Sequence, residues 1–331
     1  MLRFAFIGTG WWGNELAKNA LALKDIVEIA GCVSLSEKEA TAFQKTYGGK
    51  IFANYEAALA DPTVDAVLLA TPHSTHWQQM IAAAKAKKNV FVEKPMTLTV
   101  ETGVQAVKAC EEAQVALGIG HNRRYSRVAR KMKEMVESGA CGKILHVEAN
   151  YSSPGGTRYQ PGMWRAKREE CPGGGIAPMA LHVIDTLTWI LGPVARLSSI
   201  CKRQAVTVEL DDTSATLFEL ASGATGTLGC IFASAPTSYL KLYGTRANLE
   251  ARDNFSELTV TPANPAEPVT HERHAVDDTV QQELRAFAES CTKRVPFPVR
   301  PAEALHNVAV MQAIIASSDQ GSAWVKLPSR G

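Results

Sequence analysis

A glycine-rich turn near the start of the chain constrains the fold more than any other feature. The apolar run Leu2–Ile7 leads directly into Gly8-x-Gly10-x-x-Gly13, and a helical pattern follows. In such a turn Gly8 permits the tight bend, Gly10 leaves the backbone open to a pyrophosphate, and Gly13 lets the helix pack close to the strand. The helix start can then hold phosphate charge. The position between strand and helix favours a dinucleotide-binding turn over an ordinary glycine turn.

The first part of the chain alternates strands and helices. Strands are predicted at Leu2–Ile7, Val27–Val33, Val64–Ala70, Asn89–Val92 and Val115–Ile119, and helices at Asn14–Leu23, Glu37–Tyr47, Asn54–Ala60, His76–Lys87 and Val100–Ala113. This alternation predicts a parallel sheet that is covered by helices on both faces, with right-handed crossovers.

The pattern changes beyond residue 121. Helices are predicted at Arg127–Glu137, Ile184–Leu191, Thr279–Cys291 and Pro301–Ser317, a loop at Pro154–Gly175, and strands at Ile144–Tyr151, Val206–Glu209, Ser214–Leu220, Thr225–Phe232, Ser238–Tyr243 and Ala247–Ala251. The later strands are short and are joined by turn residues, which is typical of antiparallel sheets.

The composition narrows the class of protein. A length of 331 residues favours two domains over a single core. A formal net charge of +2 is too small to indicate a nucleic-acid partner or an acidic membrane surface. No apolar run approaches a membrane span, and the seven cysteines include no C-x-x-C pair, so we expect reduced thiols and a cytoplasmic location.

A second motif, Glu93-Lys94-Pro95, follows the strand Asn89–Val92. Together with the glycine turn, it makes the chain resemble the Gfo/Idh/MocA family of NAD(P)-dependent oxidoreductases. The resemblance extends along nearly the whole chain, through Ala70-Thr71-Pro72-His73-Ser74-Thr75-His76, Asn122-Arg123-Arg124-Tyr125, Trp164-Arg165, Pro172-Gly173-Gly174-Gly175, His182-Val183-Ile184-Asp185 and Glu303-Ala304-Leu305.

The resemblance implies two domains. Residues 1–121 are expected to form an α/β Rossmann domain with a doubly wound parallel sheet. Residues 122–331 are expected to form an α+β domain with a large open, mainly antiparallel sheet, and the helix at 301–318 could pack back on the first domain. The family's active site lies in the cleft between the domains, and one face of its large sheet commonly joins subunits, which implies a homodimer or homotetramer.

Lys94 is the first candidate catalytic residue. Pro95 restricts the backbone of Lys94 at the end of a strand, and an ammonium there could hydrogen-bond a substrate hydroxyl. An oxidised nicotinamide and partial burial would both favour the neutral amine, which suits proton transfer. The family's catalytic lysine lies in this motif, and Glu93 is expected to orient Lys94 or the cofactor. The alternative is a surface lysine.

His182 is the second candidate, because the family has a proton-transferring histidine at this position. Imidazole suits that work near neutral pH. Many family members place an Asp four residues earlier, whereas this chain has Pro178 there and no carboxylate between Gly173 and His182. A Lys–Asp–His arrangement is therefore not assumed, and a buried structural histidine is the alternative. Asp185 is expected to face elsewhere.

The resemblance also implies the remaining contacts. Expected cofactor contacts are Gly8, Thr9, Gly10, Trp11, Trp12, Gly13, Ser34, Ser36, Lys38, Thr71, Pro72, His76, Glu93, Lys94 and Asn122, and expected substrate contacts are Lys94, Arg124, Tyr151, Trp164, Arg165 and His182. For Arg124, Tyr151, Trp164 and Arg165 a structural role is an equal alternative. His73 and His76 form an H-x-x-H pair without a third ligand at a familiar spacing, so no metal is expected.

The end of the second strand bears on the choice between NAD and NADP. An NAD enzyme usually has a carboxylate there that binds the ribose hydroxyls. This chain has Ser34, and Ser36 and Lys38 follow. These residues could accept a 2′-phosphate and favour NADP, although Glu37 favours NAD.

We therefore expect an NAD(P)-dependent dehydrogenase or reductase that acts on CH–OH groups of a sugar, polyol or related cyclic alcohol. One alternative is a redox-neutral glycosidase or lyase of the same family that uses bound NAD transiently. Another is a non-catalytic dinucleotide sensor. The retained Lys94 and His182 argue against the sensor.

Overall fold

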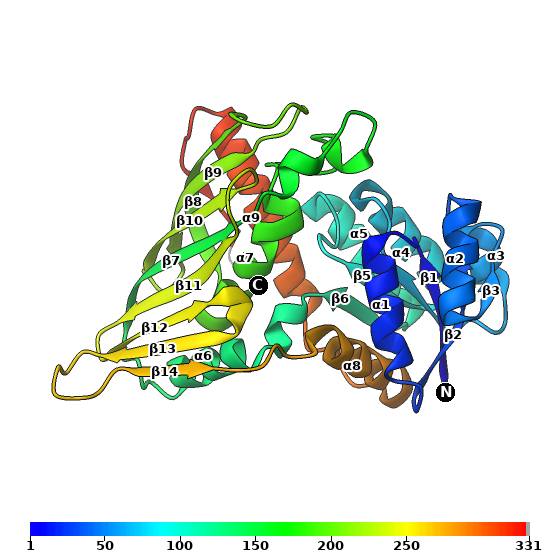
Figure 1. The fold of residues 1–331 in the computed structure, drawn as a ribbon, viewed down its shortest axis with the longest axis horizontal. Coiled ribbons are helices and arrows are strands. Elements are labelled where there is room, and N and C mark those ends of the chain that lie inside the picture. Colours follow the sequence, from blue (N-terminus) through cyan, green and yellow to red (C-terminus); the bar gives the residue numbers. More distant parts are fainter. Residues whose placement is uncertain (329–331) are drawn as a thin grey trace. The chain divides into compact units, whose positions relative to one another are not determined.

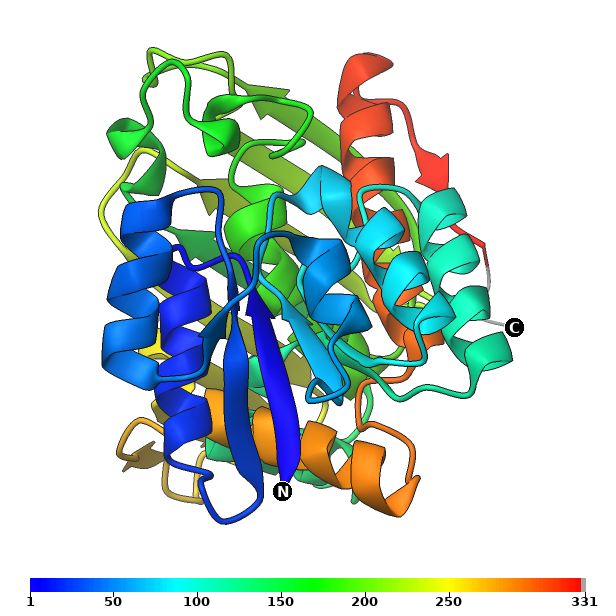
Figure 2. The same ribbon diagram turned by 90° about the vertical axis from the view of Figure 1, so that its right-hand side faces the viewer.

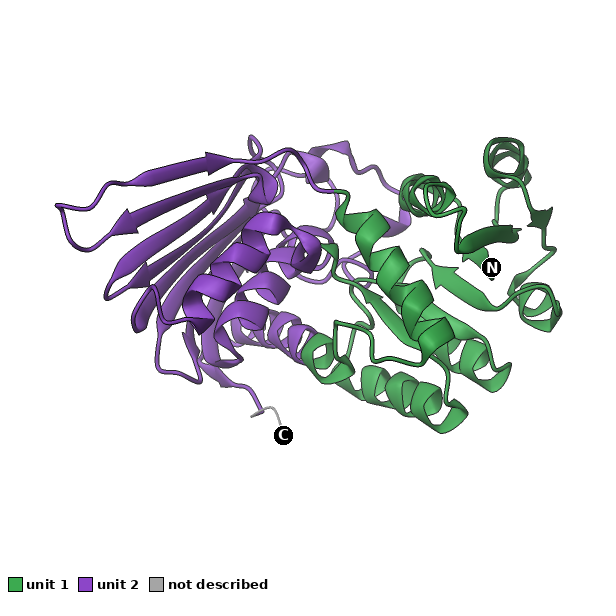
Figure 3. Cartoon of the chain, turned by 90° about the horizontal axis from the view of Figure 1, so that it is seen from below, with its two compact units in different colours: residues 1–122, 278–305 green, residues 123–277, 306–331 purple. Residues whose placement is uncertain are grey.

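The computed structural model describes residues 1–328, which form two compact units (Figure 3). The first unit combines Met1–Asn122 with Asp278–Leu305, and the second combines Arg123–Asp277 with the chain from His306 onward. The boundary after Asn122 lies one residue beyond the expected boundary at 121. The expected second domain is interrupted, however, because residues 278–305 belong to the first unit.

The first unit contains a parallel sheet of six strands within the described residues, in the order β3-β2-β1-β4-β5-β6. Its strands are β1 (Leu2–Ile7), β2 (Val27–Val33), β3 (Lys50–Ile51), β4 (Ala66–Leu69), β5 (Asn89–Glu93) and β6 (Leu117–Gly120). Its helices are α1 (Trp11–Leu21), α2 (Glu37–Tyr47), α3 (Tyr55–Ala60), α4 (His76–Lys85), α5 (Val100–Ala113) and α8 (Thr279–Lys293). Figures 1 and 2 show α1 and α2 on one side of the sheet and α4 and α5 on the other. The predicted Rossmann domain is confirmed.

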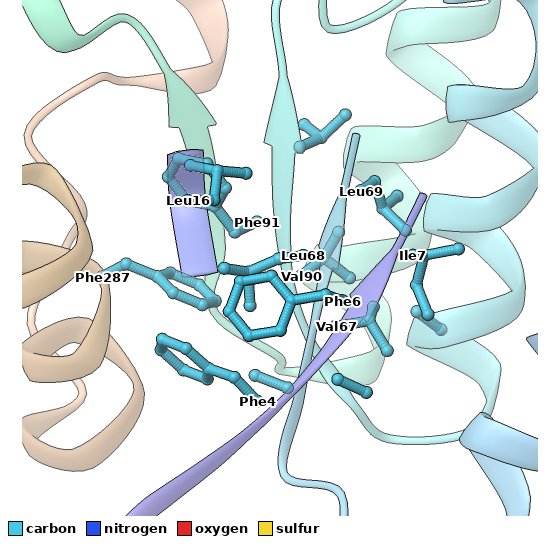
Figure 4. Close-up of a cluster of buried hydrophobic side chains, with 14 of the residues drawn as sticks. Phe4, Phe6, Ile7, Leu16, Val67, Leu68, Leu69, Val90, Phe91 and Phe287 are labelled. Atoms are coloured by element: carbon cyan, nitrogen blue, oxygen red, sulfur yellow. The ribbon is translucent and has the colours of Figure 1, made fainter. Parts of the chain in front are cut away.

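Helix α8 joins the first unit because its apolar face completes the core. Phe287 of α8 is fully buried and lies 5.7 Å from the ring of Phe4 and 5.5 Å from the ring of Phe91. Figure 4 shows Phe287 directed from α8 into the apolar cluster beside Phe4. Burial of aromatic side chains is among the largest stabilising contributions to a core, so this packing fixes α8 against the sheet.

The second unit contains a mixed sheet of nine strands within residues 1–328, in the order β14-β13-β12-β11-β7-β10-β9-β8-β15. The strands are β7 (Ile144–Ser152), β8 (Val194–Lys202), β9 (Thr213–Leu220), β10 (Thr225–Ile231), β11 (Thr237–Gly244), β12 (Ala247–Arg252), β13 (Glu257–Pro262), β14 (Thr270–Arg273) and β15 (Val325–Lys326). Only the β7–β10 pair among these described strands is parallel. The predicted large, mainly antiparallel sheet is confirmed.

Helices α6 (Arg127–Glu137), α7 (Leu181–Leu191) and α9 (Pro301–Asp319) complete the fold. The helices of the second unit lie along one face of its sheet (Figures 1 and 3). Helix α9 begins in the first unit and continues in the second from His306. In the described part of the chain, no helix is long and apolar enough to cross a membrane.

One predicted strand is wrong. Residues 206–209 form no strand, because the Asp212 carboxylate accepts hydrogen bonds from the backbone N–H groups of Gln204, Ala205 and Val206 at 2.9, 2.6 and 2.9 Å. These bonds replace the ladder that a strand would need.

Candidate functional site

The glycine turn has the geometry expected of a phosphate-binding loop. Gly8 has φ +95°, and a Cβ atom there would lie 2.6 Å from the carbonyl oxygen of Ala70. A Cβ on Gly13 would lie only 2.0 Å from the carbonyl oxygen of Gly8. At Gly10, in contrast, a Cβ would meet nothing within 4 Å. Gly8 and Gly13 must be glycine because other backbone atoms approach them closely, whereas Gly10 leaves open space above the turn.

The start of α1 can accept negative charge. Its first turn has no acidic residue, and no side chain caps its free N–H groups. Asn14 donates hydrogen bonds from Nδ2 to the carbonyl oxygens of Thr9 at 2.6 Å and Gly10 at 3.0 Å, which holds the loop. Trp11 is largely exposed beside the turn. An open glycine, N–H groups without a side-chain cap and a first helix turn without an acidic residue fit a dinucleotide pyrophosphate.

The end of β2 is tied to the glycine turn through Ser34. The Ser34 hydroxyl accepts a hydrogen bond from Thr9 Oγ1 at 2.7 Å and donates one to Glu39 Oε2 at 3.4 Å. Ser36 caps α2, because its Oγ accepts the backbone N–H of Glu39 at 3.3 Å. Lys38 is exposed. Cofactor contacts of Ser34, Ser36 and Lys38 stay predictions, and Glu39 is a residue that the sequence analysis missed.

A signal for Glu39 was present in the sequence. Ser36 followed three residues later by Glu39 is the pattern of a helix capping box, in which the glutamate turns back toward the helix start. Here the carboxylate turns back to the Ser34 hydroxyl.

The segment after β4 carries Thr71, Pro72 and His76. His76 is fully buried, with Nδ1 2.9 Å from the carbonyl oxygen of Pro95 and Nε2 3.1 Å from that of Thr71. Both partners are acceptors, so a neutral ring can donate to one of them and an imidazolium to both. His76 therefore supports the backbone after Lys94. Thr71 Oγ1 donates to Gln79 at 2.6 Å. Their cofactor contacts stay predictions.

Glu93 and Lys94 lie at the carboxyl end of β5. The Glu93 side chain is buried, whereas Lys94 is half-buried. A Cβ on Gly120 would lie 2.8–2.9 Å from the Glu93 carboxyl atoms, so the carboxyl group packs flat on the end of β6. Burial raises the pKa of Glu93 to about 7, against the opposing effects of the Trp12 indole and Lys94.

Asn122 ends the first unit at the same edge of the sheet, just beyond β6. Its Nδ2 donates to Thr279 Oγ1 at 2.9 Å. Its buried Oδ1 has no hydrogen-bond partner within residues 1–328. A buried acceptor without a protein partner is unusual and fits a donor supplied by a ligand.

In the second unit, His182 and Tyr151 lie together. His182 is half-buried in the first turn of α7, and its ring centroid is 6.2 Å from that of Tyr151 on β7. The Tyr151 hydroxyl accepts a hydrogen bond from Arg123 at 3.1 Å and donates one to Asn254 at 3.1 Å. The structure thus brings two predicted substrate contacts side by side and adds Asn254, which has no signal in the sequence.

The position of Arg124 favours a structural role over contact with the substrate. It is almost fully buried, and it donates to Asp185 from Nε at 2.8 Å and from a terminal nitrogen at 2.5 Å. Asn307 of α9 donates to the same carboxylate at 2.7 Å. This network ties the start of the unit to α7 and α9. Asp185 thus accepts hydrogen bonds from both Arg124 and Asn307. Contact of Arg124 with substrate has no support in this geometry.

The loop before α7 carries the other predicted contacts. Trp164 and Arg165 lie in a short 3₁₀ turn, where the Arg165 guanidinium stacks 4.1 Å from the Trp164 ring centroid. Pro178 lies in the π-helical turn Ile176–Ala180, which leads directly into α7. A Cβ on Gly174 would lie 1.5 Å from the Asp211 carbonyl oxygen, so the glycine run lets this loop pack against the segment that precedes β9.

No group of three or more His, Cys, Asp or Glu side chains in the described residues could hold a metal ion.

Family models match both parts of the chain. Residues 2–121 match a model described as an oxidoreductase family with an NAD-binding Rossmann fold, and residues 129–250 match the GFO/IDH/MocA C-terminal domain.

Known proteins similar to this chain include sugar and polyol dehydrogenases. Myo-inositol 2-dehydrogenase of Thermotoga maritima is 29% identical over 273 residues, covering 78% of this chain and 77% of that protein. The NADP-dependent D-xylose 1-dehydrogenase of Haloarcula marismortui is 28% identical over 218 residues, covering 64% and 61%. A solved levoglucosan dehydrogenase, in complex with NADH and levoglucosan, superposes with a TM-score of 0.91 at 19% identity, covering 99% and 100%. That last likeness shows the fold.

The buried carboxyl group of Glu93 should make the free energy of unfolding depend on pH. Since its pKa is raised from the ordinary 4.5 to about 7, the folded state binds more protons than the unfolded state between these pH values. The contribution of Glu93 to the free energy of unfolding should therefore fall as pH rises through this window, by on the order of 3 kcal/mol in total. Glu93→Gln should remove this fall, as measured by urea unfolding from pH 4.5 to 7.5. Glu101→Gln, an exposed carboxyl on α5, is the matched control. Equal pH dependence in Glu93→Gln and the wild type would contradict the assignment.

Proposed function

The chain belongs to the Gfo/Idh/MocA family of oxidoreductases, and from this premise we propose that it acts on a sugar, polyol or related cyclic alcohol. In the proposed reaction a hydride passes between the nicotinamide of NAD or NADP and a carbinol or carbonyl carbon. The relatives named for inositol and xylose support this substrate class. The observation that carries the proposal is the position of Lys94, at the same carboxyl edge of the parallel sheet as the glycine turn.

The first unit would hold the cofactor, which supplies the hydride acceptor or donor when bound. The open backbone at Gly10 and the N–H groups at the start of α1 would bind the pyrophosphate. The buried Asn122 Oδ1 would accept a hydrogen bond from the ligand. These are the residues whose geometry fits a dinucleotide.

Lys94 and His182 would handle the proton of the substrate hydroxyl. Lys94 Nζ would hydrogen-bond that hydroxyl and exchange its proton, while His76 supports the backbone after it through Pro95. His182 would serve as the second proton donor or acceptor, with its ring beside Tyr151. Trp164 and Arg165 would contact the rest of a polyhydroxylated substrate.

Glu93 has a supporting part in this scheme. Its buried carboxyl group accepts a hydrogen bond from the Lys94 backbone N–H at 3.3 Å and interacts with the Trp12 indole in the first turn of α1. It would link the lysine to the cofactor-binding loop, so we regard it as a positioning residue.

Lys94→Ala should lower kcat by about 10²–10⁴-fold, because the variant loses a positioned proton-transfer group. Its affinity for NADH should stay within about twofold of the wild type, since the glycine turn is intact. The measurement is the near-ultraviolet absorbance of the reduced cofactor, with NAD and NADP each tested against sugars, polyols, lactones and cyclic alcohols.

Lys85→Ala, an exposed lysine on α4, is the control for the loss of one positive charge. Normal turnover in Lys94→Ala would remove Lys94 from the mechanism. Cofactor binding without turnover on the whole panel would contradict the dehydrogenase assignment and favour a redox-neutral enzyme or a dinucleotide sensor.

We also propose that the chain forms a homodimer or homotetramer through the open face of the large sheet. Ile200 and Leu217 are 49% and 46% exposed on neighbouring strands β8 and β9. Cross-strand pairing places Ile200 opposite Ala215, and Leu217 opposite Ser198 and Thr227, so these side chains share one face of the sheet. The exposure of Ile200 and Leu217 indicates the face that the helices of this unit leave uncovered (Figure 3). Such a surface suits a two-fold, self-complementary contact.

Leu217→Glu should convert the oligomer to a monomer, because it places charge in an apolar contact. Light scattering coupled to gel filtration measures the mass. Val269→Glu, an equally exposed apolar position outside this face, is the control. A monomeric wild-type protein, or an unchanged mass for Leu217→Glu, would refute the proposed interface.

A reducing compartment such as the cytoplasm is our proposed location. No disulfide is found among the seven cysteines within residues 1–328, and five of these cysteines are buried. Burial raises the pKa of Cys110 and Cys230 to about 12, which suppresses the reactive thiolate. A disulfide found by mass spectrometry in the freshly isolated protein would contradict this location.

A further inference from the structure

A carboxylate of α2, that of Glu39, lies near the end of β2, where a dinucleotide-binding sheet meets the adenosine ribose. In folds of this kind the side chains just beyond the second strand face the ribose 2′ position. Ser34 stands there, and its hydroxyl is bound to the glycine turn through Thr9 at 2.7 Å. The same hydroxyl lies 3.4 Å from Glu39 Oε2. The carboxylate therefore belongs to the ribose end of the site, although it lies five residues further along the chain.

The local structure fixes the backbone of Glu39 close to Ser34, and the Glu39 side chain is exposed. Ser36 caps α2 by accepting the Glu39 backbone N–H, and the Ser36 backbone N–H donates to Ser34 Oγ at 3.3 Å. The cap and the serine contact together place Glu39 in the first turn of α2, with its side chain directed back to Ser34. A negative charge is also favourable at this end of the helix dipole.

We propose that Glu39 is the residue that makes this chain prefer NAD to NADP. Its carboxylate can accept a hydrogen bond from the ribose 2′-hydroxyl of NAD, as an Asp or Glu directly after β2 does in other NAD enzymes. A 2′-phosphate in the same place would meet a like charge, which disfavours its binding. The inference rests on the proposed function, since it assumes that the first unit binds a nicotinamide dinucleotide.

This proposal is opposite to the preference for NADP that the sequence suggested. That preference depended on Ser34, Ser36 and Lys38 being available to a phosphate. The Ser34 hydroxyl instead lies between Thr9 and Glu39, and Ser36 is occupied as the cap of α2. Lys38 is exposed, and both neighbours in the helix turn, Glu37 and Glu39, are acidic.

The test is a direct measurement of cofactor binding that needs no substrate. NADH and NADPH are titrated into the full-length protein, and binding is followed by calorimetry and by quenching of tryptophan fluorescence. The wild type should bind NADH at least tenfold more tightly than NADPH. Glu39→Gln should reduce this ratio at least fivefold, and Glu39→Lys should bring it to unity or invert it. Glu37→Gln removes an exposed carboxylate from the same helix turn and should leave the ratio within twofold of the wild type.

The outcomes separate this inference from the proposed function. Binding of NADPH as tightly as NADH by the wild type, or an unchanged ratio in Glu39→Gln, would overturn the role of Glu39 and leave the proposed function standing. Equal effects of Glu37→Gln and Glu39→Gln would also overturn it, since general charge and not the Ser34 contact would then be responsible. Failure to bind either cofactor would overturn the proposed function, and this inference with it.

Discussion

The close backbone contact between Gly13 and Gly8 is the constraint on which the first unit depends. Any side chain at Gly13 would overlap the Gly8 carbonyl. Any side chain at Gly8 would overlap the backbone of Ala70, which directly follows β4. These contacts fix the start of α1 over the edge where β1 and β4 end. Helix N–H groups, the Ser34 hydroxyl and the Lys94 backbone then occupy one edge of a single sheet, where open α/β sheets bind ligands.

At that edge of the sheet, buried apolar strands lie next to buried polar side chains, whose burial is energetically unfavourable. Strands β4 and β5 are buried, and Phe287 of α8 completes the core beneath them. Glu93, the last residue of β5, is buried at this edge, and burial raises the pKa of its carboxyl group to about 7. A carboxyl group in this environment favours its neutral form. The buried Asn122 Oδ1 is a second polar group that the protein does not satisfy within its described residues. Such groups commonly mark functional sites.

The sequence predicted the layer architecture and the glycine turn well, because both follow from local patterns. Strong apolar periodicity and a strand–turn–helix context identify Rossmann elements without tertiary information. The membership of α8 in the first unit could not be predicted locally, since it depends on Phe287 meeting Phe4 and Phe91 from distant segments. The strand expected at 206–209 failed for a similar reason, because the backbone bonds to Asp212 are invisible to periodicity.

Motif positions identified the candidate residues Lys94 and His182, and their catalytic roles stay predictions. The side-chain partners around the candidate site could not be predicted from motifs. For Arg124 the sequence favoured neither a structural role nor a substrate contact. Its hydrogen bonds to Asp185, which Asn307 also contacts, join residues far apart in the sequence and were visible only in the fold. Glu39 was detectable as a capping-box glutamate, yet only the structure showed that it reaches Ser34.

The most direct test of the central claim is the fate of a labelled hydrogen. A substrate found on the sugar and polyol panel would be deuterated at the carbon to be oxidised, and the cofactor would be analysed by mass spectrometry after turnover. A dehydrogenase should transfer deuterium to C4 of the nicotinamide and accumulate an oxidised product in equal amount. Deuterium that stays in or returns to the carbohydrate, with no net reduced cofactor, would contradict the account and identify a redox-neutral enzyme.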